Sequence, residues 1–303
     1  MTHPVVRRAG LALAAAICLG GLPAARDAAA AGDPAIEALI AAKAPAVVAV
    51  KCVIKMVATV QGQKVLDREL PREFRGSLVD AGGLVMIGNE VLDGGINASQ
   101  RAQLKAMGGE FSASATNLKV LFGNEAKEYE AVVVARDSNL GLSFVQIVDA
   151  DVKAPAVTDL AQGGETGVGS PIFVVTRKPR GYDCAPVFQR LFVTGRVEKP
   201  RPMLAVTGGS GQTGLPAYDV SGSVLGVLAV QSGSEGVDGG ASETFLLPLD
   251  TVRRAIDQVK KRVPEVLAKA RASKEKEGAK DEPKETPKEP AMEDTPPAEP
   301  KPK

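Results

Sequence analysis

The sequence predicts an all-β protein. Its apolar residues fall mostly in short runs rich in Val, Ile and Leu, and clusters of Gly, Asn, Asp and Ser separate these runs. Such spacing is typical of β-sandwiches and β-barrels. The runs do not alternate with long helical patterns, which argues against a parallel α/β sheet.

The first residues resemble an export signal. Arg7 and Arg8 form a short basic start, an apolar run follows from Ala9 to Leu22, and Ala28 to Ala31 offer small residues for cleavage. The run is shorter than the ~20 residues that span a bilayer comfortably. We expect residues 1–31 to be a signal peptide and the protein to be periplasmic or extracellular. An uncleaved N-terminal anchor is the alternative. About 270 residues would remain, enough for one large all-β domain or two small ones.

A short helix is predicted from Pro34 to Lys43, because Ile36, Leu39 and Ile40 recur at helical spacing. Strands follow it. One connection, Gly94 to Asn117, interrupts them and is interpreted as a long surface insertion that holds a short helix, Ala98 to Met107, and a stretch rich in Gly and Ser. The predicted strands are Ala46–Val60, Leu84–Ile87, Leu118–Phe122, Tyr129–Ala135, Leu142–Val148, Pro171–Thr176, Val187–Val197, Met203–Val206, Ser223–Val230 and Thr244–Leu249.

A longer helix is predicted near the end. Asp250 can cap it, and apolar residues from Val252 to Val266 recur at helical spacing. Pro264 is expected to kink or end it. From Ser273 onward Lys, Glu and Pro dominate, and such a segment buries too little apolar surface to offset the entropy of ordering it. The predicted organisation is a folded domain over residues 32–268 and a disordered tail over 269–303.

Composition excludes several function classes. The net charge is +1 and the chain has no Trp, which argues against nucleic acid as a partner. No apolar stretch after the signal is long enough to span a bilayer. We predict no metal and no cofactor. Cys52 and Cys184 would survive cleavage, and two interpretations stay open: a disulfide, or two small buried thiols. The oligomeric state is not predicted.

The chain has a single histidine, His3, and it lies in the predicted signal peptide. Histidine is the usual proton shuttle near neutral pH. A mature chain without it has no base for Ser-His-Asp or Cys-His chemistry and no His-ligated metal site.

Four segments, in order, resemble the trypsin-like serine proteases of the bacterial HtrA type. They are RGSLVDAGGLVMIGNEVLDG (75–94), LKVLFGNEAKEYEAVVVARDSNLGLSFVQI (118–147), GQTGLPAYDVSGSVLGV (211–227) and FLLPLDTVRRAIDQV (245–259). The resemblance covers residues 40–260 and implies two six-stranded antiparallel β-barrels with a cleft between them, followed here by a C-terminal helix and the tail. The tail stands where that branch usually has a regulatory PDZ domain.

The resemblance also locates the catalytic triad, and all three positions differ from the family. Glu90 stands at the histidine position, Gly141 at the aspartate position and Thr213 at the serine position. A carboxylate with an ordinary pKa near ~4.3 is a weak base toward a hydroxyl. Gly141 has no side chain to orient a base, and Thr213 is internal, unlike the N-terminal threonine of enzymes that use their own α-amine. We therefore predict no catalytic residue.

The family's oxyanion loop corresponds to Gly211, Thr213 and Gly214. Its backbone N–H groups could still bind an oxyanion or carboxylate as a vestigial site, but we favour the simpler explanation that the barrel needs the turn. Leu215, where the family has glycine, is expected to crowd this turn.

The leading hypothesis is an exported, proteolytically inactive member of the trypsin-like fold that binds a peptide or unfolded protein segment in the cleft between the barrels. Protease clefts hold substrates largely by strand addition, which does not require a triad. A second hypothesis is an active peptidase that uses Glu90 as an unorthodox base. A third is a purely structural protein whose cleft is filled by Leu215 and its neighbours.

Overall fold

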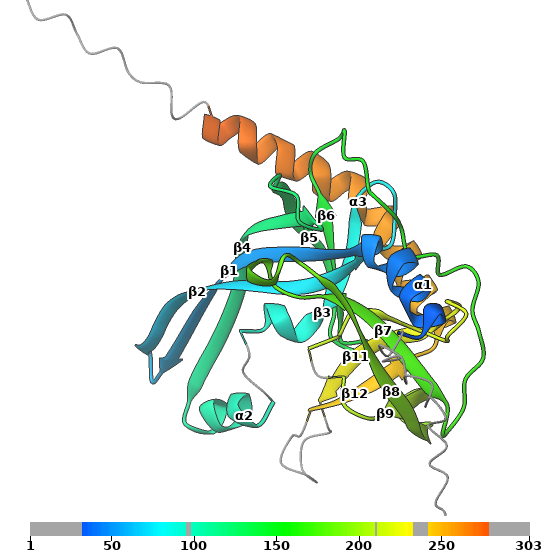
Figure 1. Ribbon diagram of the computed structural model, residues 1–303. Coiled ribbons are helices and arrows are strands. Elements are labelled where there is room, and N and C mark those ends of the chain that lie inside the picture. The colour runs from blue at the N-terminus through cyan, green and yellow to red at the C-terminus, as the bar shows by residue number, and fades with distance from the viewer. Residues whose placement is uncertain (1–31, 95–97, 210, 233–241, 279–303) are drawn as a thin grey trace, which may run out of the picture.

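The computed structural model describes residues 32–94, 98–209, 211–232 and 242–278. These residues form two closed barrels of antiparallel strands (Figure 1). The strand order is β1-β2-β3-β6-β5-β4 in barrel 1 and β10-β11-β12-β9-β8-β7 in barrel 2. This is the two-barrel architecture of trypsin-like proteases, so the predicted fold class is confirmed. Residues 1–31, the predicted signal peptide, lie outside the described residues.

The elements follow the chain in two groups. Barrel 1 contains β1 (Val47–Val60), β2 (Gln63–Leu78), β3 (Leu84–Gly88), β4 (Gly109–Phe122), β5 (Tyr129–Asp137) and β6 (Leu142–Ile147). Barrel 2 contains β7 (Pro171–Arg177), β8 (Pro186–Val197), β9 (Met203–Val206), β10 (Pro216–Tyr218), β11 (Val224–Ser232) and β12 (Ser242–Leu247). The helices are α1 (Pro34–Lys43), α2 (Ala98–Ala106) and α3 (Leu249–Gly278), with short 3₁₀ turns η1 (Ala44–Ala46), η2 (Asn89–Leu92) and η3 (Arg180–Tyr182).

Strand β3 shows how the sequence builds the core. All five of its residues are buried, because successive side chains point to opposite faces and both faces are covered. Val85 and Ile87 join the core of barrel 1, whereas Leu84 and Met86 join a cluster shared by both barrels and α3. The end of β3 is therefore fixed from both sides, and it carries the loop that contains Glu90.

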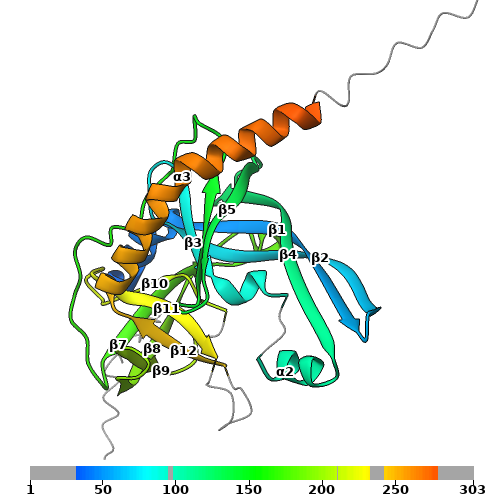
Figure 2. The same ribbon diagram turned by 180° about the vertical axis from the view of Figure 1, so that it is seen from behind.

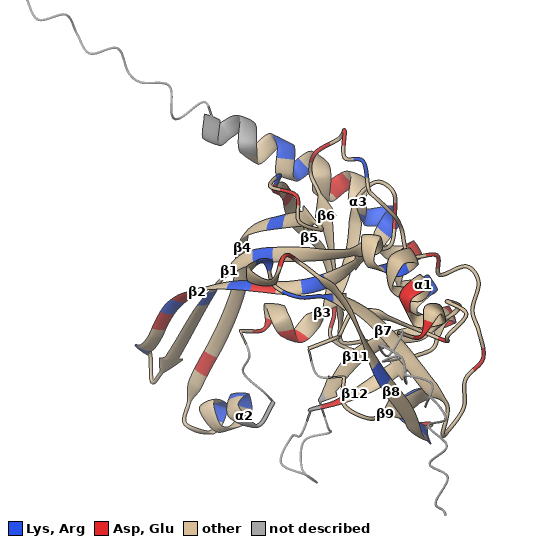
Figure 3. Ribbon diagram, viewed as in Figure 1, with Lys and Arg blue, Asp and Glu red and all other residues tan. Residues whose placement is uncertain are grey.

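The prediction missed two strands, β2 and the short β10. It also began β4 too late, because this strand starts at Gly109, inside the segment interpreted as an insertion. The reason is that β2 is mostly exposed and charged along residues 63–73, so it lacks the apolar alternation that marks a strand. It pairs instead along the whole of β1. Together with β4, these strands form a projecting three-stranded wing (residues 53–60, 63–73 and 109–116), along which basic and acidic residues are interspersed (Figure 3).

Helix α3 also exceeds its predicted length. It continues through Pro264 and over residues 269–278, which were assigned to the disordered tail. Lys, Ala and Glu favour helix here, and Lys269 pairs with Glu265 one turn earlier at 2.6 Å. Figure 2 shows α3 running from barrel 2 across barrel 1, and its residues Val252 and Ile256 are buried in the shared cluster. Residues 279–303 lie outside the described part. No helix in the described ranges combines the length and the apolar character needed to cross a membrane.

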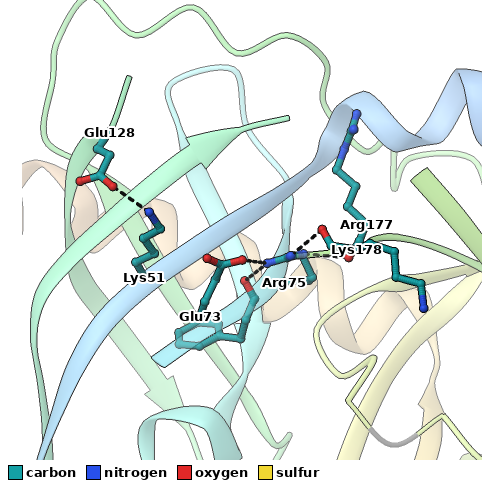
Figure 4. Close-up of polar contacts among 7 residues, drawn as sticks. Lys51, Glu73, Arg75, Glu128, Arg177 and Lys178 are labelled. Atoms are coloured by element: carbon teal, nitrogen blue, oxygen red, sulfur yellow. Dashed lines mark hydrogen bonds and ion pairs between the residues drawn. The ribbon is translucent and has the colours of Figure 1, made fainter. Parts of the chain in front are cut away.

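Two arginines join the barrels (Figure 4). Arg75 of β2 donates to the carbonyl oxygens of Arg177 at 2.9 Å and Lys178 at 2.8 Å, both in barrel 2, and pairs with Glu73 at 2.8 Å. Arg177 donates to Ala44 O, just before β1, at 3.0 Å and to Cys184 O at 3.1 Å. Each guanidinium thus satisfies backbone carbonyls on both sides of the junction, and we call this pair the arginine clamp.

Replacing Arg75 with Ala is expected to lower the free energy of unfolding by about 1–3 kcal/mol, because two carbonyls at the junction lose their donor. Arg75→Lys is expected to recover little, since one ammonium cannot span three acceptors in the plane of a guanidinium. Urea denaturation measures both. Arg72→Ala, an exposed change on the same strand, is the control and should stay within about 0.5 kcal/mol of the parent. Equal losses at Arg75 and Arg72 would contradict the clamp.

Candidate functional site

A cleft of about 680 Å³ lies between the two barrels. Barrel 1 contributes Glu73, Phe74 and Arg75 from β2 and Val91 from η2. Barrel 2 contributes the end of β7, the start of β8 and the loop before β10; these residues are Thr176, Arg177, Lys178, Pro179, Val187, Phe188, Gln189, Gly211, Gln212 and Thr213. The cleft thus combines apolar walls with three cationic side chains against one carboxylate.

The structure brings the three predicted triad positions together at this cleft. The hydroxyl of Thr213 donates to Glu90 Oε1 in a short hydrogen bond. The backbone N–H of Asn89, next to Glu90, donates to the carbonyl of Gly141 at 2.8 Å. Glu90, Gly141 and Thr213 come from distant segments of the sequence, and the structure places them in one site.

The Glu90 carboxylate is largely withdrawn from solvent. Its Oε2 atom is buried and has no hydrogen-bond partner among the described residues. Burial raises the pKa of Glu90 above its ordinary value; the hydrogen bonds from Thr213 and from Glu90's own backbone N–H oppose this rise in pKa, and the charge of Asp93 adds to it. The Glu90 carboxylate folds back over the Gly88 backbone. A Cβ atom added at Gly88 would lie 2.6 Å from both carboxylate oxygens.

Gly141 leaves no room for a side chain. Its φ of +69° is in the left-handed region, which L residues with a Cβ rarely adopt. A Cβ at Gly141 would overlap the carbonyl oxygen of Val230 in barrel 2, and the amide nitrogen of Gln231 would lie 3.2 Å away. The neighbouring barrel therefore occupies the place where the family's aspartate would project.

A polar network that the sequence did not predict holds the Glu90 loop. The side-chain oxygen of Asn89, Oδ1, accepts from Ser143 Oγ at 2.7 Å and from Arg136 Nε at 3.2 Å. The side-chain nitrogen of Asn89, Nδ2, donates to Asp93 Oδ2 at 3.2 Å. Arg136 and Asp93 close the ring with a short ion pair. Asn89 is buried, so a satisfied network stabilises η2 and fixes where Glu90 points.

The vestigial oxyanion loop keeps part of its geometry. Gly214 has φ +79° and packs directly on the backbone of Ile87 and Gly88, and its N–H donates to Leu228 O at 2.8 Å. The N–H groups of Gly211 and Thr213 make no backbone hydrogen bond to another described residue. Leu215 is fully buried in the core of barrel 2. Leu215 is not among the residues that line the cleft, so the expectation that it fills the cleft is wrong.

The cysteines are free and buried, Cys52 in barrel 1 and Cys184 beside β8 in barrel 2. Burial raises the pKa of the Cys52 thiol to about 11, so it stays protonated near neutral pH. No group of His, Cys, Asp and Glu with metal-binding geometry occurs within the residues that the structure describes.

Comparison with solved structures shows likeness at the level of the fold. No protein-family model matches the chain, and no curated protein matches it. Among solved structures, the chain is similar to the protease domain of MamO from Magnetospirillum magneticum in its apo form, with 16% identity over 71% of this chain and 97% of that chain and a TM-score of 0.43. The functional argument therefore comes from the geometry of this site.

Replacing Glu90 with Gln is expected to change how stability depends on pH. The folded-state pKa of Glu90 is raised above its unfolded value, so its contribution to stability is full below the unfolded pKa and is lost as the pH rises through the folded pKa. Glu90→Gln should therefore become more stable relative to the parent as the pH rises. Urea unfolding from about pH 4 to about pH 8 measures this difference. The exposed Glu110→Gln is the control; a difference that does not vary with pH would contradict the burial of Glu90.

Replacing Gly141 with Asp or Ala is expected to cost at least about 2 kcal/mol of unfolding free energy, because the positive φ and the overlap with Val230 O both oppose a Cβ. The matched control is Gly181→Ala, since a Cβ there meets no atom within 4 Å. Thermal and urea unfolding measure the loss. If Gly141→Ala unfolds like Gly181→Ala, the predicted exclusion of a side chain is contradicted.

Proposed function

We propose that this protein is an exported, catalytically inactive homologue of trypsin-like proteases that binds an extended peptide or unfolded protein segment in its inter-barrel cleft. One observation carries the loss of catalysis: at Gly141 the backbone of barrel 2 fills the space that a base-orienting carboxylate needs. Triad chemistry requires a nucleophile, a base and a group that orients the base.

The other two positions support the same conclusion. Thr213 is only 4% exposed. A hydroxyl buried to this extent is not open to a substrate carbonyl. Glu90 occupies the proton-shuttle position. An imidazole there would accept the proton on one nitrogen and donate from the other to an orienting group, whereas a carboxylate has no N–H to donate. Loss of a whole triad costs on the order of a million-fold in turnover in a convergent serine protease.

The cleft itself supports a binding role. Its apolar lining, including Phe74 and Val187, and its cations Arg177 and Lys178 offer contacts to both side chains and charges of a peptide. The arginine clamp holds the two walls together without any ligand. A preformed cleft lowers the entropic cost of binding. Leu215 leaves this space open, which disfavours a purely structural role.

One observation favours the alternative of an active peptidase, namely the short hydrogen bond from Thr213 to Glu90. Burial raises the pKa of Glu90 toward the range in which a carboxylate is a better base. The alternative lacks an orienting group and an exposed nucleophile.

Export rests on the pattern of the first residues and is tested separately, by fractionating cells that express the full chain and locating it by immunoblot.

The purified full chain is expected to show no labelling by a serine-reactive fluorophosphonate probe and no casein turnover above buffer, since no activated hydroxyl is available. Mass spectrometry of the labelled chain and a fluorescent casein assay are the measurements. Stoichiometric labelling at Thr213 or Ser210 would overturn the inactive assignment. Any activity found in the parent and abolished in Glu90→Gln would instead establish the Glu90-dependent peptidase.

A further inference from the structure

Strand β8 has an unpaired stretch of edge. The N–H and C=O groups of successive residues in a strand point toward opposite neighbours, and the hydrogen bonds of two residues show which way each group of β8 points. Val193 bonds toward β7: its N–H donates to Ser170 O at 3.1 Å and its carbonyl accepts from Gly169 at 2.8 Å. Phe192 bonds the opposite way, toward Thr207, which follows β9; its carbonyl accepts from the Thr207 N–H at 2.9 Å and its N–H donates to Thr207 Oγ1 at 2.9 Å.

Phe188 and Arg190 are spaced at two-residue steps from Phe192, so their N–H and C=O groups point away from β7 as well. Strand β9 pairs with β8 only over Val193–Val197. Beyond Thr207 the chain turns away through two glycines with positive φ, Gly208 and Gly209. Within the part of the chain that the structure describes, no residue bonds the outward backbone groups of Phe188 and Arg190.

This edge adjoins the proposed binding cleft. Phe188 and its neighbours Val187 and Gln189 line the cleft, and Phe188 also lines a second hollow of about 640 Å³ together with Phe173 and Arg190. A segment lying in the cleft therefore meets the backbone of β8 sideways, in the position of a missing neighbouring strand.

The side chains at this edge are unusual for this chain. Phe188 and Phe192 are each 41% exposed and lie on one face of β8, although the whole chain has only eight Phe. The Arg190 guanidinium lies over the Phe192 ring, 5.1 Å from its centroid, and 5.9 Å from that of Phe173. Exposed aromatics that flank a cation form a surface suited to alternating apolar and acidic side chains.

Charge decides the class of ligand. No carboxylate of the described residues forms an ion pair with Lys178, at the cleft, or with Arg190, at the edge. Arg177, between them in the cleft lining, donates only to backbone carbonyls. Glu73 is the one acidic residue that lines the cleft, and Arg75 already pairs with it. The second hollow, in contrast, sets Arg190 against Asp33, Glu165 and Asp219. The excess of positive charge lies in the cleft, where Lys178 has no carboxylate partner among the described residues, and the cleft therefore favours a partner that carries negative charge.

We propose that an extended acidic peptide segment adds as a new strand to the free edge of β8 at Phe188 and Arg190. The N–H and C=O groups of these two residues supply the main-chain hydrogen bonds, Phe188 and Phe192 receive apolar side chains, and Lys178 receives a carboxylate. This inference rests on the proposed peptide-binding function and specifies its strand, its ligand charge and its register.

The test measures binding of a fluorescein-labelled octapeptide of alternating Val and Glu to the full chain by anisotropy, with alternating Val and Lys as the charge control. Phe188→Pro removes an outward N–H, whereas Phe188→Ala removes the same side chain and keeps the N–H. Because the Phe188 N–H donates to no residue that the structure describes, Phe188→Pro should melt within a few degrees of Phe188→Ala. Gln189→Pro, which loses a bond to β7, should melt much lower.

We expect the Val-Glu peptide to bind the parent and the Val-Lys peptide not to bind. Phe188→Pro should bind the Val-Glu peptide at least about tenfold more weakly than Phe188→Ala does, since main-chain pairing is lost. Lys178→Glu should also lose at least about tenfold. Equal affinity of Phe188→Pro and Phe188→Ala, with binding lost in the cleft-wall variant Val91→Arg, would overturn strand addition while leaving cleft binding intact. Absence of binding by either peptide to the parent would overturn both.

Discussion

The site depends on one close approach between two pieces of backbone. The end of β3 and the loop before β10 meet so tightly that a Cβ at Gly214 would overlap the backbone of Ile87, and a Cβ at Gly88 would collide with the carboxylate of Glu90. This contact presses Thr213 against Glu90 and brings barrel 2 over Gly141. Interiors pack at near-crystalline density, so neither barrel can yield space to the other without moving its strands. Every property of the candidate site follows from that lack of space.

The clamp and the close approach both join the two barrels, by different means. Near η2, the barrels touch through glycines; at the cleft, the guanidinium groups of Arg75 and Arg177 span the gap and bind backbone carbonyls. Backbone acceptors do not titrate and do not change rotamer, so the width of the cleft is set by groups of fixed geometry. A cleft of this kind is suited to recognising a main chain, whose spacing is equally fixed. Free strand edges beside it then add recognition of hydrogen bonds to recognition of shape.

The sequence predicts best the elements whose burial gives them a regular pattern of apolar residues. The strands that line the two cores, such as β3 and β11, have continuous Val, Leu and Ile, and helix α1 has the predicted bounds. It missed β2 because that strand is charged and exposed along residues 63–73, and it ended the last helix too early because Lys-rich and Glu-rich segments resemble both helix and disorder. The site positions came from a resemblance over ordered segments. The Asn89 network and the overlap at Gly141 depend on residues far apart in sequence, and no local pattern encodes them.

The glycine at position 141 has an evolutionary consequence. A single codon change can replace this glycine with aspartate, but the main chain of the neighbouring barrel lies where the new Cβ would stand. A descendant of this chain with a carboxylate at this position would first have to shift two strands apart, at a cost to folding and with no catalytic benefit until a nucleophile and a base were also in place. Selection acting one substitution at a time would have no gradual route back.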